Sequence, residues 1–428
     1  MSAPSVPIDQ TAPRGRYRWT ICSLLFVATT INYIDRQVLG ILAPDLQRAI
    51  GWSEVEYGYI VVAFQAAYAL GLPLFGRFID RYGTKLGYTI SILGWSIAAM
   101  AHAFASSALS FGVARALLGV SEAGNFPASI KTTAEWFPKK ERALATGIFN
   151  SGANIGAVVA PATVPFLAEH WGWGGAFVAT GAIGFFWIIA WLMLYERPEA
   201  SKRTTPEELA YIQADREEAS TEKVPMGVLL GHRATWAFVI GKFLTDPIWW
   251  FYLYWLPKFL NTQYGLTLTN LGLPLIAIYT MTTVGSIGGG WASSRLITAG
   301  RTVNTSRKLV MMVCALLVVP IIFMSGSANL WTSVFFIGLA AAAHQGWSAN
   351  IFTLVSDIFP KKAVGSVVGL GGMAGSVGGM LFSMTAGYLL QWTGSYMTLF
   401  YIAGSAYLVA LVVIQLLVPK ITPVEGIA

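Results

Sequence analysis

The chain has 428 residues, of which 55% are apolar and only 11% are charged. A soluble globular protein carries about 25% charged residues. The 28 Lys and Arg and 21 Asp and Glu are too few to coat the two or three domains that this length would require. The composition therefore excludes a soluble enzyme, a soluble nucleic-acid binder and a disordered chain. Cys22 and Cys314 lie far apart in apolar segments, which indicates neither a disulfide framework nor a metal site.

Apolar stretches long enough to cross a bilayer recur along the whole chain, since a membrane-spanning helix needs about 20 mostly apolar residues. The first stretch is too long for a signal peptide, and polar residues follow its apolar start. The sequence thus predicts an all-α membrane protein with twelve transmembrane helices. Their expected positions are 18–43, 55–76, 86–106, 108–130, 143–168, 173–195, 234–257, 267–292, 309–325, 329–355, 364–390 and 396–418.

The positive charges predict how these spans are oriented. Of the 28 Lys and Arg, 23 fall in the terminal segments and the loops of one side, and three lie within spans. Only Arg48 and Lys258 fall in the loops of the other side. Because Lys and Arg accumulate on the cytoplasmic side of a membrane protein, both termini are predicted to be cytoplasmic. The net charge of +7 is accordingly a topology signal and does not indicate nucleic-acid binding.

A repeated motif divides the spans into two related halves. Segments 137–156 and 359–378 share the sequence Phe-Pro-Lys-Lys and two downstream glycines, at an offset of 222 residues. The only long charged segment, 197–233, separates the sixth span from the seventh. We therefore predict a six-helix half at 1–196, a cytoplasmic linker at 197–233 and a second six-helix half at 234–428. Parallel repeats of this kind face each other across a central cavity.

Four ionisable side chains lie inside spans of the first half, where such groups are expensive and usually mark a transport pathway. They are Asp35, Arg36, Arg115 and Glu122. Adjacent helical residues diverge by about 100°, so Asp35 and Arg36 cannot share a partner. We expect Asp35 to lie near Arg115, and Arg36 to face the cavity and bind a substrate carboxylate through its planar fork. Asp35 and Glu122 are the expected proton carriers, and a purely structural charge network is the alternative.

Other polar and aromatic side chains at similar depth are candidates to bind a substrate ring and its hydroxyl groups. They are Tyr33, Gln65, Tyr68, Asn154, Trp249, His344 and Gln345. Ordinary helix packing is the alternative for the aromatic residues, and a lone His in an apolar helix is as often structural. Lys242 and Asp246 are four residues apart and are expected to pair on one helix face as a structural device.

Two glycine-containing segments are expected to control how closely helices approach. The loop between the second and third spans contains four candidate gate residues: Gly76, Asp80, Arg81 and Gly83. Its charges can latch the cytoplasmic side through neighbouring helix ends, although an ordinary positive loop is the alternative. The fifth span contains small residues that predict close packing between the halves: Gly147, Gly152 and Gly156.

Several motifs together resemble those of the anion:cation symporter branch of the major facilitator superfamily. They are Asn32-Tyr33-Ile34-Asp35-Arg36, the loop 76–85, the segment 115–122, Glu135-Trp136-Phe137-Pro138 and Ala343-His344-Gln345-Gly346. Within that branch the chain is most similar to bacterial hexuronate transporters, over nearly all of its length. The resemblance implies the major facilitator fold, a multi-pass location in the bacterial inner membrane, and proton-coupled uptake of an organic anion.

The resemblance also implies roles for individual residues. Asp35 and Glu122 match the acids that carry protons in relatives, and Arg36, Tyr33 and Tyr68 match residues that touch substrate. Some relatives have a Gln in the fifth span near the site. This chain has Ala153 and Asn154 in that region, so recognition of substrate hydroxyl groups is expected to differ.

These observations predict a secondary active transporter that imports a hexuronate or a related sugar acid by proton symport with alternating access. Its expected partners are the organic anion, the proton and the lipid bilayer. We expect a monomer with no cofactor, metal, catalytic residue or nucleic-acid partner. Anion exchange, and proton symport of another carboxylate such as a hexonate, an aldarate or an aromatic acid, stay open as alternatives.

Two other classes of protein are disfavoured. A non-transporting nutrient sensor would need a signalling domain, and neither the tails nor the segment 197–233 is long enough for one. An intramembrane enzyme would need a nucleophile–base pair or a set of metal ligands. The four His residues show no paired spacing that would supply either.

Overall fold

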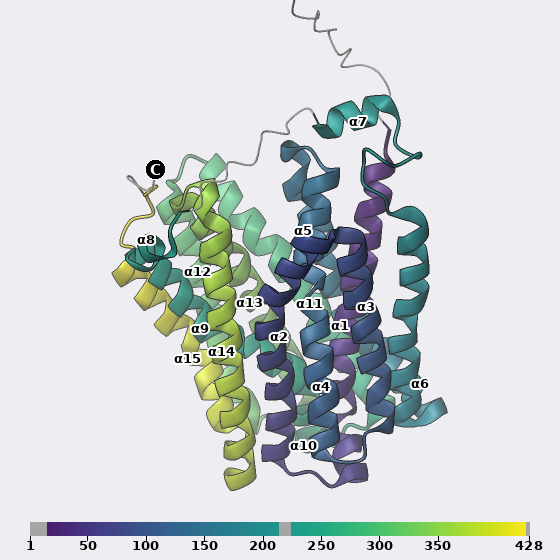
Figure 1. Cartoon of the computed structure of the whole chain (residues 1–428). Helices are drawn as coiled ribbons and strands as arrows, with labels where there is room; N and C mark the ends of the chain where they lie inside the picture. Colours follow the sequence, from purple (N-terminus) through teal and green to yellow (C-terminus); the bar gives the residue numbers. More distant parts are fainter. Residues whose placement is uncertain (1–14, 214–223, 425–428) are drawn as a thin grey trace, which may run out of the picture.

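The computed structural model describes residues 15–213 and 224–424, and these ranges are almost entirely helical (Figure 1). The helices of the first half are α1 (Tyr17–Ile50), α2 (Glu54–Tyr82), α3 (Thr84–Ala101), α4 (Ala108–Glu122), α5 (Asn125–Trp136) and α6 (Lys139–Leu194). A short 3-10 helix, η1 (His102–Phe104), continues α3. Two short helices follow in the connecting segment: α7 (Pro206–Gln213) and α8 (Met226–Leu230).

The second half repeats this pattern of long helices. Its members are α9 (Arg233–Tyr254), α10 (Leu256–Tyr264), α11 (Leu268–Thr298), α12 (Val303–Val318), α13 (Leu330–Ile358), α14 (Lys361–Thr393) and α15 (Met397–Leu417). A 3-10 helix, η2 (Val319–Gly326), extends α12. The all-α prediction is confirmed, and most helix ends fall within a few residues of the expected spans.

The described helices accommodate the twelve predicted spans. Seven helical segments are long and apolar enough to cross a membrane by length and composition. One of them, α6, contains two spans, because its backbone leaves the helical conformation at Gly172, where φ is +69°. The four remaining spans, in α1, α4, α9 and α13, are shorter or more polar. All four carry charged or polar groups of the central region, which lowers their apolar content.

Close packing joins α1 to both parts of α6. The Trp187 indole N–H donates a 2.8 Å hydrogen bond to the Leu24 carbonyl oxygen. A Cβ on Gly156 would lie 2.6 Å from the Thr30 carbonyl oxygen, and one on Gly152 would lie 2.5 Å from a carbonyl of the same helix. These glycines therefore allow the backbones of α6 and α1 to approach each other.

The expectation that the fifth-span glycines pack between the two halves is wrong. Gly152 and Gly156 contact α1, which belongs to their own half, and a Cβ on Gly147 would meet nothing within 4 Å. The physical reason is that α1 and the first part of α6 are neighbours in one bundle. A small-residue stripe reveals that a helix packs closely, but it does not identify the partner helix.

Both ends of the described chain lie on one side of the molecule, which we call the terminal side (Figure 1). Helix α7 lies there too, and its Glu208 accepts hydrogen bonds from the backbone N–H groups of Tyr17 and Arg18, each at 3.1 Å. Residues 214–223 of the predicted linker 197–233, and residues 1–14 and 425–428, lie outside the described residues. The same holds for the side chains of the repeated lysines. The boundaries at 196 and 234 stay predictions.

On the side opposite the terminal side, the two halves are in direct contact. Glu54 at the start of α2 forms an ion pair with Lys258 of α10. The Tyr57 hydroxyl donates a 2.6 Å hydrogen bond to the Tyr254 carbonyl oxygen. We call this contact region the seal; it consists of these four residues together with Tyr59 of α2 and Tyr388 of α14, whose hydroxyl oxygens lie 2.7 Å apart.

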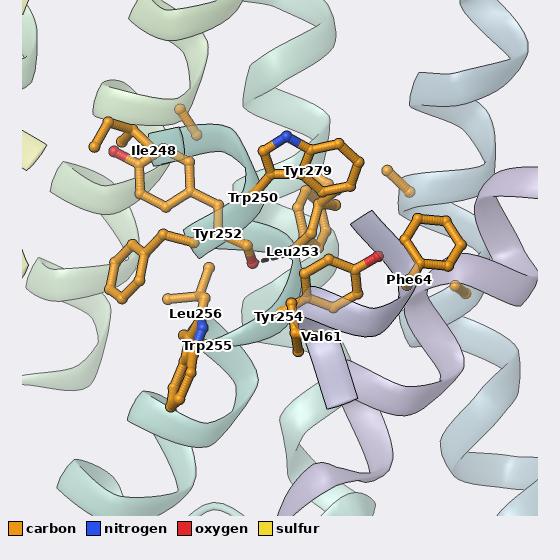
Figure 2. Packing of buried hydrophobic residues seen from close by; sticks show 14 of the residues in the cluster. Val61, Phe64, Ile248, Trp250, Tyr252, Leu253, Tyr254, Trp255, Leu256 and Tyr279 are labelled. Carbon is orange, nitrogen blue, oxygen red and sulfur yellow. Dashed lines mark hydrogen bonds between the residues drawn. The ribbon is translucent and has the colours of Figure 1, made fainter. Parts of the chain in front are cut away.

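Aromatic packing supports the seal from beneath. Figure 2 shows Phe64 of α2 facing Trp250 and Tyr254 of α9, and each pair of ring centroids is 6.4 Å apart. Burial lowers the pKa of the Lys258 ammonium group, and the Glu54 carboxylate opposes part of that shift. The seal thus closes one side of the interface between the halves, and any space between them lies toward the terminal side.

Candidate functional site

A cavity of about 480 Å³ lies between the two halves. Its wall includes Thr146 and Val368, each about two helical turns into a helix that begins on the terminal side. The cavity therefore extends from the middle of the molecule toward the terminal side, with the seal behind it. Seven of the residues singled out from the sequence as substrate or ring contacts line it: Tyr33, Arg36, Tyr68, Asn154, Trp249, His344 and Gln345.

Arg36 is held in the cavity wall by an ion pair with Glu122 of α4. Its Nε and Nη2 atoms lie 3.1 and 2.8 Å from Glu122 Oε2, and Nη2 also donates to Asn32 Oδ1 at 3.2 Å. Both charged side chains are almost completely buried. Nη1 has no hydrogen-bond partner within the described part of the chain, so one edge of the guanidinium remains available to a ligand.

Aromatic rings surround the guanidinium group on several sides. Its Cζ atom lies 4.8 Å from the ring centroid of Tyr33, 5.0 Å from that of Tyr68 and 5.6 Å from that of Trp250. Cation–π contacts of this kind stabilise a positive charge that has left water. Because Trp250 comes from the second half, these rings place residues of both halves around one cation.

Asp35 and Arg115 do not line the cavity. Asp35 is 1% exposed, and no side chain in the described ranges meets hydrogen-bond geometry with either of its carboxylate oxygens. Arg115 donates from Nη2 to the Arg36 carbonyl oxygen at 3.1 Å and covers the ring of Phe64. The expected proximity of Asp35 and Arg115 does not take the form of a direct ion pair among the described residues.

A second ion pair lines the cavity, formed by Lys242 and Asp246 of α9. Lys242 Nζ lies 2.8 Å from Asp246 Oδ2 and 4.3 Å from the ring centroid of Phe352. The sequence predicted that these two residues pair. It assigned the pair a purely structural role and did not predict that both side chains face the cavity. The apolar sequence of α9 gives little indication of which side of the helix faces the interface.

His344 lies in the cavity wall with partners of its own. Its ring stacks on Trp249 with centroids 5.4 Å apart and planes 4° apart, and its Nδ1 lies 2.6 Å from the Tyr407 hydroxyl oxygen. Gln65 differs from the other candidates. Its side chain is buried beside the cavity without lining it, and its amide atoms have no partner among the described residues.

The candidate gate loop lies at the terminal side. Lys131 of α5 bonds to both Asp80 Oδ1 at 2.9 Å and the Ile79 carbonyl oxygen at 3.0 Å. Arg81 covers the ring of its neighbour Tyr82. Gly83 ends α2 with φ at +90°, a conformation that favours glycine. In the part of the chain that the structure describes, no recorded hydrogen bond or ion pair of this loop reaches the second half.

The Gly76 position completes the candidate gate, and a Cβ there would meet nothing within 4 Å.

Three polar residues that line the cavity were not identified by the sequence analysis: Thr146, Asn150 and Ser286. A signal for two of them was present, because Thr146 and Asn150 precede the candidate Asn154 at intervals of four residues. Residues at that interval share one face of a helix.

The two helical halves, the central cavity and the one-sided seal define a membrane transporter. The chain belongs to the Major Facilitator Superfamily, whose model matches residues 25–343 and 296–427. It is therefore a transporter and not an enzyme, and it crosses the membrane many times.

Comparison with individual proteins agrees with this assignment. The chain is 32% identical over 382 residues to the hexuronate transporter of Escherichia coli K12, covering 88% of each. It is 29% identical over 437 residues to a probable galactarate/D-glucarate transporter of the same strain, covering 98% of each. The inward-open structure of the xylose transporter from E. coli superposes with a TM-score of 0.74 at 15% identity, covering 96% of this chain and 98% of that one.

Proposed function

We propose that the protein imports a sugar acid, a hexuronate or a related acid, by proton symport with alternating access. The names of its relatives support the substrate class. The observation that carries the coupling is the Arg36–Glu122 ion pair in the cavity wall. A guanidinium there can hold either the carboxylate of Glu122, whose Oε2 accepts from both Nε and Nη2, or the carboxylate of a substrate.

Proton and substrate binding are linked through this exchange. While Glu122 is ionised it neutralises Arg36, and an incoming anion meets little net positive charge. A proton on Glu122 removes that competition and leaves Arg36 to the substrate carboxylate. Asp35 is the proposed second proton site, because a buried carboxylate without an ion-pair partner among the described residues is costly and a bound proton removes this cost.

The one-sided cavity supports alternating access. With the seal intact and the cavity extending to the terminal side, the arrangement matches one end state of a rocking cycle. We assign the terminal side to the cytoplasm on the basis of the 23 positive residues predicted there. The proposed location is the bacterial inner membrane, with both termini in the cytoplasm. The cytoplasmic pH would then deprotonate Glu122 and Asp35 and release the substrate.

Anion exchange is the second candidate. Its support is that one guanidinium can pass from one carboxylate ligand to another without any proton. Proteoliposomes loaded at pH 7.5 and diluted into galacturonate at pH 5.5 or 7.5 separate the two. Symport predicts accumulation only with the pH gradient, whereas exchange predicts uptake only when a counter-anion is inside.

Variants test the assigned roles in the same assay. Glu122→Gln and Asp35→Asn mimic the protonated side chains, so each should lose accumulation driven by the pH gradient while keeping counterflow of labelled galacturonate. Asp45→Asn, which removes a partly exposed acid paired with Arg48, is the matched control and should behave as wild type. Full accumulation in both Glu122→Gln and Asp35→Asn would overturn the proton-carrying roles.

A further inference from the structure

The proposed function uses one end of the cavity and leaves a second charged group in its wall unexplained. Lys242 and Asp246 both line the cavity, and both come from α9 of the second half. We propose that Lys242 binds a second carboxylate of the substrate, so that the cavity prefers sugar acids with two carboxylates over those with one. This inference rests on the proposed function and names its substrate class.

Two contacts position the Lys242 ammonium group in the wall. It lies 2.8 Å from Asp246 Oδ2 and 4.3 Å above the ring of Phe352, and its side chain is 7% exposed. An ammonium group has three N–H donors, and Asp246 is its only acidic partner among the described residues. Asp246 offsets the charge of Lys242 as Glu122 offsets that of Arg36, so a carboxylate that enters the cavity shares the ammonium group with Asp246 and uses the N–H donors that Asp246 leaves.

Asp246 is held in place from the other side. A Cβ on Gly375 of α14 would lie 2.2 Å from Asp246 Oδ2, so only a glycine lets α14 pass so close to this carboxylate. The acid is thereby positioned between α14 and Lys242. This positioning orients the ammonium group toward the cavity and limits how far the lysine can move.

The two cations line the same cavity at different depths. Trp250, whose ring lies 5.6 Å from Arg36 Cζ, is eight residues beyond Lys242 in the same helix. Eight residues correspond to about 12 Å along the helix axis between the two backbone positions, and the pairing of Lys242 with Asp246, four residues toward Trp250, brings the ammonium group closer to Arg36 than this. Because both cations face one cavity, the two carboxylates of one extended sugar diacid can each meet a cation.

A purely structural role explains the position of the pair less well. An i,i+4 ion pair adds little to an already stable helix, and charges within a membrane protein cost several kcal/mol and usually mark a transport pathway. The pair also lies in the cavity and not at a helix end near water. The sugar-acid relatives differ in the number of carboxylates their substrates carry, so overall identity does not decide between the two classes.

Binding of three matched acids to purified full-length protein tests the inference. Galactarate has two carboxylates, whereas galactonate and galacturonate have one. Wild type should bind galactarate about 10- to 100-fold more tightly than either monoacid, as expected for one additional charge-assisted contact. In Lys242→Gln/Asp246→Asn, which removes both charges together, this preference should fall to within about threefold, because galactarate loses more affinity than either monoacid.

Lys308→Gln, which changes a lysine on the terminal side away from the cavity, is the matched control and should keep the preference. Equal affinity of wild type for diacid and monoacid would overturn the inference and leave the proposed function intact. An equal loss of affinity for all three acids in the double variant would also overturn the inference, because the Lys242–Asp246 pair would then have a structural role. Absence of binding and uptake for every sugar acid would instead overturn the proposed function itself.

Discussion

Arg36 and Glu122 come from helices α1 and α4, 86 positions apart in the sequence, and form a buried ion pair 2.8 Å long in the wall of the central cavity. The pair joins two helices of the same half, while Trp250 of the other half covers the guanidinium. This ion pair is therefore made within one half, while an aromatic ring of the other half contacts its cation.

Replacing Arg36 by Lys should weaken substrate binding about 10- to 100-fold. A lysine keeps the charge, but it lacks the planar fork that holds a carboxylate through two hydrogen bonds. Titration of purified protein with galacturonate measures the change. Arg48→Lys, in an exposed i,i+3 pair, should bind normally. Wild-type affinity in Arg36→Lys would contradict a bidentate contact.

Removing one partner of the buried Arg36–Glu122 pair should destabilise the protein more than removing both partners. Glu122→Leu leaves the Arg36 charge without its partner, which we expect to destabilise the protein by about 3–5 kcal/mol. Arg36→Leu/Glu122→Leu leaves no buried charge and should recover most of that loss. Thermal unfolding in detergent compares the two variants. A double variant less stable than Glu122→Leu would show that the pair itself provides stability.

Gly156→Ala should impair transport, whereas Gly147→Ala should not. A Cβ at position 156 would lie 2.6 Å from the Thr30 carbonyl oxygen, so α6 and α1 would have to separate. A Cβ at position 147 meets nothing within 4 Å, which makes it a control for general effects of alanine. Initial uptake rates and melting temperatures of both variants provide the measurement. Equal behaviour of the two would argue against a close α1–α6 contact.

The Glu54–Lys258 pair should control how often the seal opens. Glu54→Gln leaves the buried Lys258 charge without an acid, which costs the sealed state about 1–3 kcal/mol. Labelling of Ser383→Cys by a membrane-impermeant maleimide should then be faster, because Ser383 of α14 is buried and packs against Gly58 of α2 in the sealed state. Glu54→Leu/Lys258→Met, with neither charge, is the control and should label more slowly than Glu54→Gln.

The labelling rate of the Ser383→Cys protein, divided by that of an exposed cysteine at the same pH to remove the pH dependence of the thiol itself, should also depend on pH in one direction. Burial lowers the pKa of Lys258 in the sealed state, and opening returns this group to water and its ordinary value. Lys258 therefore binds a proton less readily in the sealed state than in the open state. Raising the pH from the lowered pKa of the sealed state to the ordinary pKa of a lysine should favour sealing and slow the labelling. At pH values below the lowered pKa, labelling should no longer depend on the protonation of Lys258. Faster labelling across that pH range would contradict this assignment.

The sequence was sufficient for the spans but not for the charge pairing. Apolar length places each helix, because a bilayer requires about the same number of apolar residues everywhere. The partner of Arg36 could not be derived in this way. Arg36 and Arg115 both lie at a depth that Glu122 could reach, and the choice of Arg36 as the partner of Glu122 depends on how α1 and α4 are rotated about their axes.

Rotation of helices also explains the other differences. Lys242 and Asp246 share a helix face by spacing alone, yet α9 is apolar on most of its surface and the sequence does not indicate which face meets the cavity. Gln65 lies at the correct depth and was expected to line the cavity, but its side chain is turned into the protein. In both cases the sequence predicted how deep in the membrane the residue lies, but not the direction in which its side chain points from the helix.

The contact between Tyr59 and Tyr388 at the rim of the seal has an energetic consequence. Their hydroxyl oxygens lie 2.7 Å apart at a partly exposed position, and each tyrosine belongs to a different half. When the halves separate there, each hydroxyl exchanges its protein partner for water, a substitution with little net free energy. Probes attached near this rim would therefore follow the conformational cycle while leaving the relative populations of its states almost unchanged.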